Sequence, residues 1–539
     1  MAYEDLKEAI RTHALFTADS GARIIATDGA SRGAWMFDFR ALLLQPKWLK
    51  RYAEIFWEQY GSKYPFQVCG MESAAISLVA AVLMEGEARG KPVNGLYVRK
   101  SRKHHGLMKQ VEGTPTKDPV ILVDDLINSG KTFEKQVRVL EREGLKVSDL
   151  FAILAVSDKD AYADSFAKSI PLRALFSLEE FGLSNTFGDA SKKTQLTEVW
   201  RFAAPNPSFN YVLQKSAPVL DEQRAYVGSD TGMFYALDQR DGSPTWAFEI
   251  GPHLQGKGIF SSPALHDDLV YFGAYDGNVY ALNKKTGAVK WTYGDADWVG
   301  SSPALAPDKG LLFIGLEFGL FRKLGGIVAL NMDTGARVWQ HRTSEFTHGT
   351  PLYIKEKNMV VVGSNDDTVY AYRADSGEPV WQYRTDGPVK SSFTYDARWK
   401  LIVFGSLGGL CYALSTEGVP VFAHELGAGV YSTPLIEDHA AFVASLDKHL
   451  YAIELPTGKL LWKYATRGRI FSSPIMVEGL IYLGSNDGCL HEIDPKSGTG
   501  GVVFQATDRI VNRIAYNKST QRFFVGTDAN ELYCLQRPH

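Results

Sequence analysis

A repeated sequence unit fills the second part of the chain, and it restricts the fold more than any other feature. Copies such as "AYVGSDTGMFYALDQRDGSPTW", which begins at Ala225, and "VYFGAYDGNVYALNKKTGAVKW", which begins at Val270, recur about every 42 residues, a period typical of a propeller blade. Each copy has a "SSP"-like start, an apolar strand, a Gly/Asp turn, a "YAL" strand, a "TG" turn and a "W" strand. Turns that contain glycine suit tight hairpins between strands. Eight such copies predict an all-β, eight-bladed propeller over residues 198–539.

The ends of the repeat region predict how the ring closes. The last copy, "FFVGTDANELYCLQRPH", stops before its W strand, whereas an isolated "EVWRF" around Trp200 precedes the first full copy. We expect the Trp200 strand to complete the final blade, because this leaves no exposed sheet edge. A tryptophan recurs four residues after the turn glycine, and we expect it to pack blades together. These positions are Trp246, Trp291, Trp339, Trp381 and Trp462, with Phe422 and Phe504 in two other copies.

The copies resemble the PQQ-like repeat of quinoprotein dehydrogenases and their non-catalytic relatives. In the quinoproteins an adjacent cysteine pair and calcium-binding carboxylates hold the quinone, in an exported protein. Here the cysteines are scattered and lack metal-type spacing, and the charged N-terminal residues do not resemble a signal peptide. We therefore expect no PQQ, and a rigid scaffold that presents loops to a protein or small-molecule partner. The cysteines are Cys69, Cys411, Cys489 and Cys534.

Residues 1–184 follow a different pattern, in which helical and strand segments alternate. Amphipathic stretches such as "KWLKRYAEIFWEQYG" are separated by short apolar runs such as "FQVCG", "VILVDD" and "LFAILAVSD". This alternation predicts an α/β domain with a mostly parallel sheet. Residues 185–197 are polar and rich in Gly, Ser, Thr and Lys, which predicts a linker between the two domains.

Composition narrows the function classes. A chain of 539 residues exceeds one ordinary domain, and 45% hydrophobic residues with a net charge of −3 give no bias toward nucleic acid. The longest nearly apolar run, residues 74–84, is shorter than the roughly 20 residues that a membrane helix needs. We therefore expect neither a nucleic-acid nor a membrane partner. Scattered cysteines favour a reduced, cytoplasmic protein.

The segment "VILVDDLINSGKT", from Val120 to Thr132, ends like an ATP-binding P-loop. A P-loop has the pattern G-x-x-x-x-G-K-[ST]. Counting back from Gly130, its first glycine should stand at position 125, where this chain has Asp125. A carboxylate there repels nucleotide phosphates, so the sequence argues against a P-loop NTPase.

The same segment suits a ribose phosphate. An apolar strand over residues 120–123 ends in Asp124 and Asp125, and a polar turn then leads into a helix. N–H groups of the turn and the helix N-terminus can bind a phosphate, while the carboxylates accept hydrogen bonds from vicinal hydroxyls. The segment also resembles the signature of type I phosphoribosyltransferases, in which the acidic pair binds the ribose hydroxyls of PRPP. The resemblance therefore implies that Asp124 and Asp125 are catalytic residues. The resemblance assigns the 5-phosphate to Asn128, Ser129, Gly130, Lys131 and Thr132.

A basic stretch, "LYVRKSRKHHGLMKQVEG", follows a predicted strand. By itself it is compatible with a solvated loop or a nucleic-acid patch. Its order is similar to the "YVRKxxKxHG…EG" lid of orotate phosphoribosyltransferases, which closes over pyrophosphate. The resemblance implies that Arg99 and Lys100 bind pyrophosphate, and that Lys103 and His105 are catalytic because they neutralise the departing charge.

The resemblance also implies a metal ion and an assembly. Mg²⁺ normally bridges pyrophosphate and the ribose hydroxyls, so Asp124 and Asp125 would hold it indirectly, through PRPP and water. Relatives of this type are usually homodimers with lids that cross between subunits. We therefore expect a homodimer formed through residues 1–184.

Departures from the family pattern gather where the acceptor base should bind. Asn128 replaces a usual threonine, and Arg32 stands about where a lysine contacts the base. Lys159 replaces an orotate-binding arginine, and Ser73 lies where orotate enzymes often have lysine or glycine. Lysine and arginine are not equivalent in bidentate recognition of a carboxylate. The sequence therefore predicts a PRPP-dependent phosphoribosyltransferase with a nucleobase-like acceptor, and it favours another base over orotate.

Two alternatives stay open at this stage. The altered acceptor side also fits a non-catalytic regulator that senses PRPP or a nucleotide, although such a protein has no need of a leaving-group lid. The propeller could instead carry the function as a scaffold, with the first domain as a dimerising handle.

Overall fold

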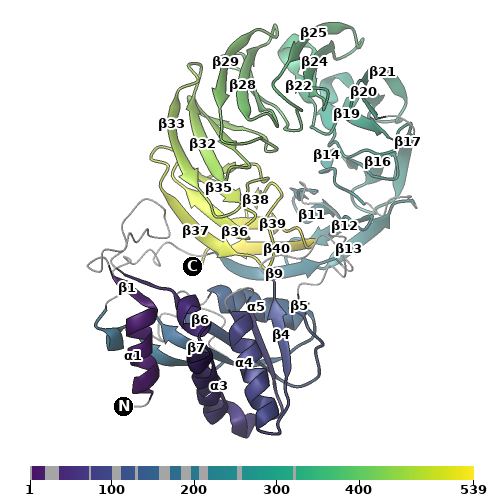
Figure 1. The fold of residues 1–539 in the computed structure, drawn as a ribbon. Helices are drawn as coiled ribbons and strands as arrows, with labels where there is room; N and C mark the ends of the chain where they lie inside the picture. The colour runs from purple at the N-terminus through teal and green to yellow at the C-terminus, as the bar shows by residue number, and fades with distance from the viewer. Residues whose placement is uncertain are drawn as a thin grey trace. The chain divides into compact units, whose positions relative to one another are not determined.

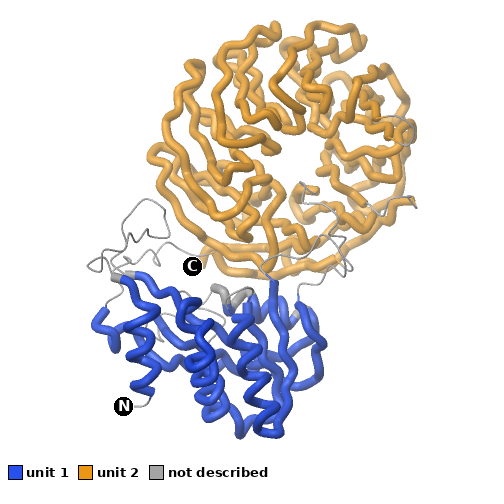
Figure 2. The backbone as a smooth tube through the Cα atoms, in the orientation of Figure 1, with its two compact units in different colours: residues 1–190 blue, residues 191–539 orange. Residues whose placement is uncertain are grey.

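A computed structural model describes residues 3–17, 35–71, 75–99, 111–127, 131–156, 170–183, 196–204, 216–251, 258–319 and 323–538. The chain divides into two compact units, residues 1–190 and 191–539 (Figure 2). Most of the predicted linker, residues 185–197, lies outside the described residues, and its last residue already belongs to strand β9. No described helix is both long and apolar enough to cross a membrane.

The first unit contains a six-stranded sheet in the order β5-β4-β3-β6-β7-β8. All pairs are parallel except β4 with β5, so the predicted mostly parallel α/β sheet is confirmed. The strands are β3 (Gln67–Met71), β4 (Asn94–Val98), β5 (Val111–Glu112), β6 (Val120–Ile127), β7 (Val147–Ala155) and β8 (Leu172–Ser177). A separate hairpin pairs β1 (Leu15–Thr17) with β2 (Trp35–Phe37).

Helices cover both faces of this sheet (Figure 1). One face packs against α1 (Glu4–His13), α2 (Phe39–Leu43), α3 (Pro46–Tyr60) and α4 (Ala75–Ala88), and the other against α5 (Lys131–Arg142). Short 3₁₀ helices span Gly61–Lys63 and Glu179–Phe181. In β6, Ile121 and Val123 pack on the α3 side and Leu122 on the α5 side, as the alternation of a doubly buried strand requires.

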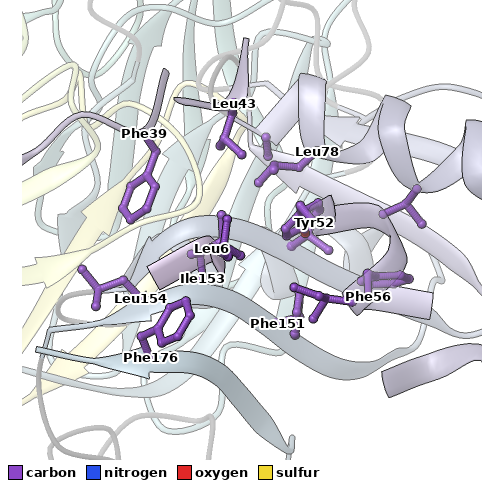
Figure 3. Close-up of a cluster of buried hydrophobic side chains, with 14 of the residues drawn as sticks. Leu6, Phe39, Leu43, Tyr52, Phe56, Leu78, Phe151, Ile153, Leu154 and Phe176 are labelled. Atoms are coloured by element: carbon purple, nitrogen blue, oxygen red, sulfur yellow. The ribbon is translucent and has the colours of Figure 1, made fainter. Parts of the chain in front are cut away.

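Aromatic side chains dominate the core between α3 and the sheet (Figure 3). The ring centroid of Phe151, on β7, lies 5.5 Å from that of Phe56 and 5.8 Å from that of Tyr52. All three side chains are fully buried. Edge-to-face and tilted contacts of this kind fix the helix against the sheet, and they bring Tyr52 close to the end of β6.

The second unit folds into eight four-stranded antiparallel sheets within its described residues, arranged as a ring of blades (Figures 1 and 2). The predicted eight-bladed propeller is confirmed. The first four blades are β10 (Val219–Leu220), β11 (Arg224–Gly228), β12 (Met233–Asp238) and β13 (Pro244–Glu249); β14 (Ala264–His266), β15 (Leu269–Gly273), β16 (Asn278–Asn283) and β17 (Val289–Gly294); β18 (Ala304–Ala306), β19 (Leu311–Phe318), β20 (Leu324–Asn331) and β21 (Arg337–Thr343); β22 (Leu352–Ile354), β23 (Met359–Gly363), β24 (Thr368–Arg373) and β25 (Pro379–Arg384).

The remaining blades repeat this plan, with short 3₁₀ helices at Pro307–Lys309 and Lys355–Lys357 elsewhere in the ring. Blades five to seven are β26 (Thr394–Asp396), β27 (Leu401–Gly405), β28 (Leu410–Ser415) and β29 (Pro420–Glu425); β30 (Leu435–Glu437), β31 (Ala440–Ala444), β32 (His449–Glu454) and β33 (Leu460–Ala465); β34 (Ile475–Val477), β35 (Leu480–Gly484), β36 (Cys489–Ile493) and β37 (Gly500–Gln505). The last blade joins β38 (Ala515–Asn517), β39 (Arg522–Gly526) and β40 (Glu531–Gln536) to β9 (Thr197–Ala203).

Strand β9 closes the ring as the sequence predicted. It pairs antiparallel with β40 (Figure 1), in a register that places Trp200 opposite Cys534. The strand that opens the unit is therefore the outer strand of its final blade. This arrangement covers the edge of β40, which would otherwise expose unpaired backbone groups.

Within the described residues, the repeated tryptophans lock six of the eight blades to the next, which confirms their predicted packing role. The indole N–H of Trp291 donates to the carbonyl of Met332 in the following blade, over 2.8 Å. Its ring lies against Gly335, where a Cβ atom would approach the ring to 2.6 Å. The same carbonyl contact recurs at five further tryptophans over 2.9–3.0 Å. They are Trp200, Trp246, Trp339, Trp381 and Trp462.

Candidate functional site

The acidic pair lies on β6, just beyond the point where this strand stops pairing with β3. Strand β3 pairs with β6 as far as Val123, whereas β7 continues to pair with β6 as far as Ile127. The chain runs from β3 to β4 on one side, and β6 lies on the other. Ligands of parallel α/β sheets bind beyond the carboxyl ends of the strands at such a switch point. Asp124 and Asp125 occupy this place.

The strand extends further than the sequence suggested. We expected it to end at residue 123, but β6 continues through both aspartates to Ile127. The reason is the partner strand, because β7 supplies hydrogen bonds along this stretch that β3 does not. The carboxylates are thus fixed by a rigid strand and not by a loop.

The two carboxylates have different surroundings. Asp124 is 8% exposed, whereas Asp125 is only partly buried. The backbone N–H of Asp125 donates to Oδ1 of Asp124 over 3.0 Å. Burial raises the pKa of the Asp125 carboxyl, and the negative charge of Asp38 raises it further, against hydrogen bonds that lower it. Burial is thus the main reason why the Asp125 carboxyl favours its neutral form.

Helix α5 follows the pair directly. It begins at Lys131, so Lys131 and Thr132 form its first turn and are not part of the preceding loop. A helix start presents free backbone N–H groups and the positive end of its dipole to an anion. The strand that carries the carboxylate pair and the N-terminus of α5 are thus separated by three residues, 128–130.

A second acidic and basic pair stands beside this site. Asp38 caps α2 by accepting the N–H of Arg40 over 3.1 Å, and it also accepts from the Arg40 Nε over 2.8 Å. The bonds from Arg40 hold the pKa of Asp38 below its ordinary value. The charges of both residues act on Asp125. Sequence reasoning missed this pair, which lies in "FDFR", residues 37–40.

Tyr52 is the second residue that sequence reasoning missed. Its side chain is fully buried on α3, and its hydroxyl has no hydrogen-bond partner among the described residues. Burial raises the pKa of Tyr52 well above its ordinary value, and the charges of Asp124 and Asp125 add to this. A spacing of apolar residues along a helix does not distinguish this tyrosine from a core aromatic residue, so no sequence signal marked it.

The base of the predicted lid is a short antiparallel ribbon. Val98 of β4 lies opposite Val111 of β5, which brings the two ends of the basic segment together. The NH1 atom of Arg99 lies 3.4 Å from Oε1 of Glu112. Gly113 adopts φ 109°, and a Cβ atom there would lie 2.5 Å from the carbonyl oxygen of Gly95. A larger side chain at position 113 would clash with the backbone of β4, which explains the glycine of the "EG" motif.

Most of the other predicted site residues cannot be placed. The side chains of Lys131 and Thr132 are not described, although their backbone is. The remaining residues lie outside the described ranges, and their roles stay predictions. These are Arg32, Ser73, Lys100, Lys103, His105, Asn128, Ser129, Gly130 and Lys159.

Sequence comparison agrees with the architecture of both units. An orotate phosphoribosyltransferase from Bradyrhizobium sp. is 28% identical over 152 residues, which are 27% of this chain and 80% of that enzyme. The orotate phosphoribosyltransferase of Pyrococcus abyssi is 30% identical over 144 residues, 25% of this chain and 75% of that enzyme. The family described as outer membrane protein assembly factor BamB matches residues 192–352, 323–403 and 419–500.

Structure comparison gives the fold of the second unit. BamB from Moraxella catarrhalis superposes with a TM-score of 0.51 at 20% identity, over 64% of this chain and 98% of that one. Fold and sequence together define a type I phosphoribosyltransferase domain followed by an eight-bladed propeller of PQQ-like repeats. The chain belongs to the orotate phosphoribosyltransferase family through its first unit and to the BamB-type repeat family through its second.

Proposed function

We propose that the first unit transfers the phosphoribosyl group of PRPP to a nucleobase-like acceptor and releases pyrophosphate. One observation carries this proposal above all. Asp124 and Asp125 lie in the carboxyl-terminal half of β6, at the switch point of the sheet, and α5 begins three residues after this strand ends. This order suits a ligand that has a vicinal diol and a phosphate on one ring. The relationship to orotate phosphoribosyltransferases supports the same reaction class.

The reaction forms one bond at the anomeric carbon and breaks another. A nucleophilic atom of the acceptor, which gives up its proton, bonds to C1 of the ribose. The C1–O bond to pyrophosphate breaks, and its electron pair leaves with the pyrophosphate. Asp124 and Asp125 accept hydrogen bonds from the ribose hydroxyls and orient the ring. Their negative charge also stabilises the positive charge that develops on the ring in the transition state.

The leaving group needs positive charge on its own side. Arg99 stands at the start of the basic segment, anchored to Glu112 at the foot of the β4–β5 ribbon. In the proposed reaction, Lys100, Lys103 and His105 follow it over the pyrophosphate. A lid that brings these cations in and excludes water strengthens their effect on the departing charge.

The residues of this site fit Mg²⁺. Asp125 has a raised pKa because of burial and the neighbouring Asp38, so the ionised pair gains from a cation nearby. Hard carboxylate oxygens are the ligands that Mg²⁺ prefers, usually with several waters retained. Bound to PRPP, the ion would neutralise the pyrophosphate, and Asp124 and Asp125 would hold it through the ribose hydroxyls and water.

The acceptor is proposed to differ from orotate. Asn128, Arg32, Lys159 and Ser73 depart from the family pattern at positions assigned to the base. A lysine in place of an arginine does not offer the paired N–H groups that grip a carboxylate. Asn128 offers both a donor and an acceptor, which suits the edge of a neutral base.

Mass spectrometry tests this function without a guess about the acceptor. The full-length protein is incubated with isotope-labelled PRPP, Mg²⁺ and a metabolite extract, and products that gain the labelled ribose phosphate are identified. A matched reaction contains the Asp124→Asn/Asp125→Asn variant. A labelled nucleotide made only by the wild type supports the proposal. Binding of PRPP with no labelled product from any extract would instead favour a sensor.

We propose that the propeller serves as the module that binds a partner or ligand. Its blades are locked by repeated tryptophans, so its loops are held on a rigid ring. A homodimer through residues 1–184 is proposed for the enzyme unit, because lids of this type act across subunits in related enzymes. Light scattering on the full chain, and on a lid variant mixed with an acid-pair variant, tests whether two subunits build one site.

A further inference from the structure

Blade seven holds a cluster of three potential metal ligands that the proposed reaction does not use. Asp487 lies in the turn between β35 and β36, and Cys489 and His491 lie on β36. One ligand atom from each residue lies within 4.8 Å of the other two. The Cys489 and His491 residues are buried, and the Asp487 side chain is 10% exposed. A carboxylate, a thiol and an imidazole thus meet in a largely enclosed place.

The other blades show what this position normally contains. In blade four the Tyr370 hydroxyl donates to Asp366 over 3.0 Å, and Thr368 stands between them in sequence. In blades two and six the equivalent tyrosines likewise donate to the aspartate of their own turn. Blade seven keeps the aspartate but has histidine in place of tyrosine and cysteine in the middle position. The hydrogen-bonded Asp–Tyr pair of the other blades is thus replaced in blade seven by three residues that can each bind a metal ion.

The histidine is oriented as a metal ligand would be. Its Nδ1 lies 2.9 Å from the hydroxyl of Tyr464, which comes from β33 of the preceding blade. Its buried Nε2 has no hydrogen-bond partner of good geometry, and it lies 3.5 Å from Oδ2 of Asp487. A contact from one ring nitrogen to the outer sphere, with the other nitrogen aimed at the site, is typical of zinc-bound histidine.

The two other ligands are also held from outside the cluster. Oδ1 of Asp487 accepts the backbone N–H of Cys489 over 2.9 Å. Oδ2 accepts the backbone N–H of Arg467 over 3.0 Å and lies 3.5 Å from Nε2 of His491. The Cys489 thiol donates to Oε1 of Gln505, at the end of β37, over 3.1 Å, and this bond is given up when the thiol loses its proton. Gln505 in turn donates to the carbonyl oxygen of Asp487 over 3.3 Å. These contacts arrange the cluster before any ion arrives.

We propose that Asp487, Cys489 and His491 form a Zn²⁺ site between blades six and seven. Thiolate, imidazole and carboxylate together are a ligand set that zinc accepts, with a tetrahedral arrangement and a fourth position for water. Donor atoms at about 2.0–2.3 Å from a tetrahedral zinc lie about 3.3–3.8 Å from one another. The 3.5 Å between Nε2 and Oδ2 already meets this condition. Cys489 loses its thiol proton when the metal binds.

Co²⁺ is the probe for this site, because a thiolate bound to Co²⁺ gives an intense near-ultraviolet charge-transfer band. Reduced, chelator-treated full-length protein is titrated with Co²⁺ and then with Zn²⁺. The site predicts a band that saturates at one Co²⁺ per chain and disappears as Zn²⁺ displaces it. Any Mg²⁺-type site at Asp124 and Asp125 contains oxygen ligands only and gives no such band.

The repeat itself supplies the matched variant. Cys489→Thr/His491→Tyr recreates the Asp, Thr and Tyr set of blade four, so it is expected to fold. Its circular dichroism and melting temperature should match those of metal-free wild-type protein, while the band and the Zn²⁺-induced rise in melting temperature are lost. Asp487→Asn should weaken Zn²⁺ binding by at least about ten-fold while keeping the thiolate band.

Two outcomes overturn the proposal. One is a wild-type protein that gives no thiolate band with Co²⁺ under reducing conditions. The other is an equal Zn²⁺ content, after dialysis, in wild type and in the folded Cys489→Thr/His491→Tyr variant. In either case His491 and Asp487 would be an ordinary ion pair that replaces the tyrosine contact of the other blades.

Discussion

The backbone N–H of Asp125 donates to Oδ1 of Asp124, so the Asp124 carboxylate is held against the backbone of its own strand, β6. This contact makes the two carboxylates unequal. Asp124 is more deeply buried and is oriented by its neighbour, whereas Asp125 faces the charges of Asp38 and Arg40. Variants of this site and of the ring can be tested without knowledge of the acceptor.

Asp125→Asn should raise the stability of the first unit at neutral pH. Burial raises the pKa of Asp125, so the folded state favours the protonated acid. Its contribution to stability is complete below the ordinary aspartate pKa of about 4 and is lost as the pH rises through the higher pKa of the folded state. Thermal melts of wild type and variant across this range measure the difference.

The difference between these melts should vanish at low pH, because Asp125 is then protonated in both the folded and the unfolded chain. Glu87→Gln is the control, since this exposed carboxylate lies on α4 of the same unit and is not part of the acidic pair. A variant that melts below wild type at neutral pH contradicts the raised pKa of Asp125, because burial would then not disfavour its ionised form.

Tyr52→Phe should stabilise the first unit by about 1 kcal/mol, because it removes a buried hydroxyl that lacks a hydrogen bond. The ring and its contact with Phe151 remain. Urea unfolding followed by far-ultraviolet circular dichroism gives the change in free energy of unfolding. If the hydroxyl also binds substrate, the same variant loses affinity for PRPP while it gains stability.

Tyr226→Phe provides the opposite case in the propeller. The Tyr226 hydroxyl donates to Asp221 over 2.7 Å and lies 3.0 Å from the carbonyl oxygen of Lys284, so its removal should destabilise by about 1 kcal/mol. Equal losses in both variants would show that the Tyr52 hydroxyl has a partner after all.

Gly335→Ala should destabilise the propeller more than Gly310→Ala, although both glycines lie in blade three and have positive φ values of 71° and 63°. An alanine Cβ at Gly335 would lie 2.6 Å from the Trp291 ring, whereas nothing lies within 4 Å at Gly310. Backbone strain costs about 1–2 kcal/mol at each site, and overpacking adds about 1–3 kcal/mol at Gly335 only. Chemical unfolding of both variants separates the two costs.

Removal of β9 should open the ring. A fragment of residues 205–539 lacks the strand that pairs with β40 and the Trp200 indole that donates to the carbonyl of Gln239 over 3.0 Å. We expect it to melt lower than residues 191–539 and to self-associate through its exposed edge. Thermal melts and size-exclusion chromatography measure both effects. Equal behaviour of the two fragments would mean that β9 is not needed for closure.

Local sequence patterns predicted the strands and helices that repeat or alternate, because the spacing of apolar residues directly reflects which side chains are buried. The blades, the closing strand at Trp200 and the parallel sheet were therefore predictable. Tertiary context decided the rest. The extension of β6 to Ile127 depends on β7, and the isolation of the Tyr52 hydroxyl depends on what packs around α3. The blade-seven cluster was missed because cysteine spacing was considered alone. An alignment of the repeats places His491 where other copies have a tyrosine, and this comparison would have revealed the cluster.

Release of pyrophosphate from PRPP by the full-length protein tests the central claim most directly. The assay compares wild type with the Asp124→Asn/Asp125→Asn variant, in the presence of Mg²⁺ and with or without the acceptor fraction. The account predicts pyrophosphate release that depends on both the acceptor and Mg²⁺ and falls at least about a hundred-fold in the variant, in line with the loss of groups that stabilise transition-state charge. Release at the same rate by wild type and variant would contradict it.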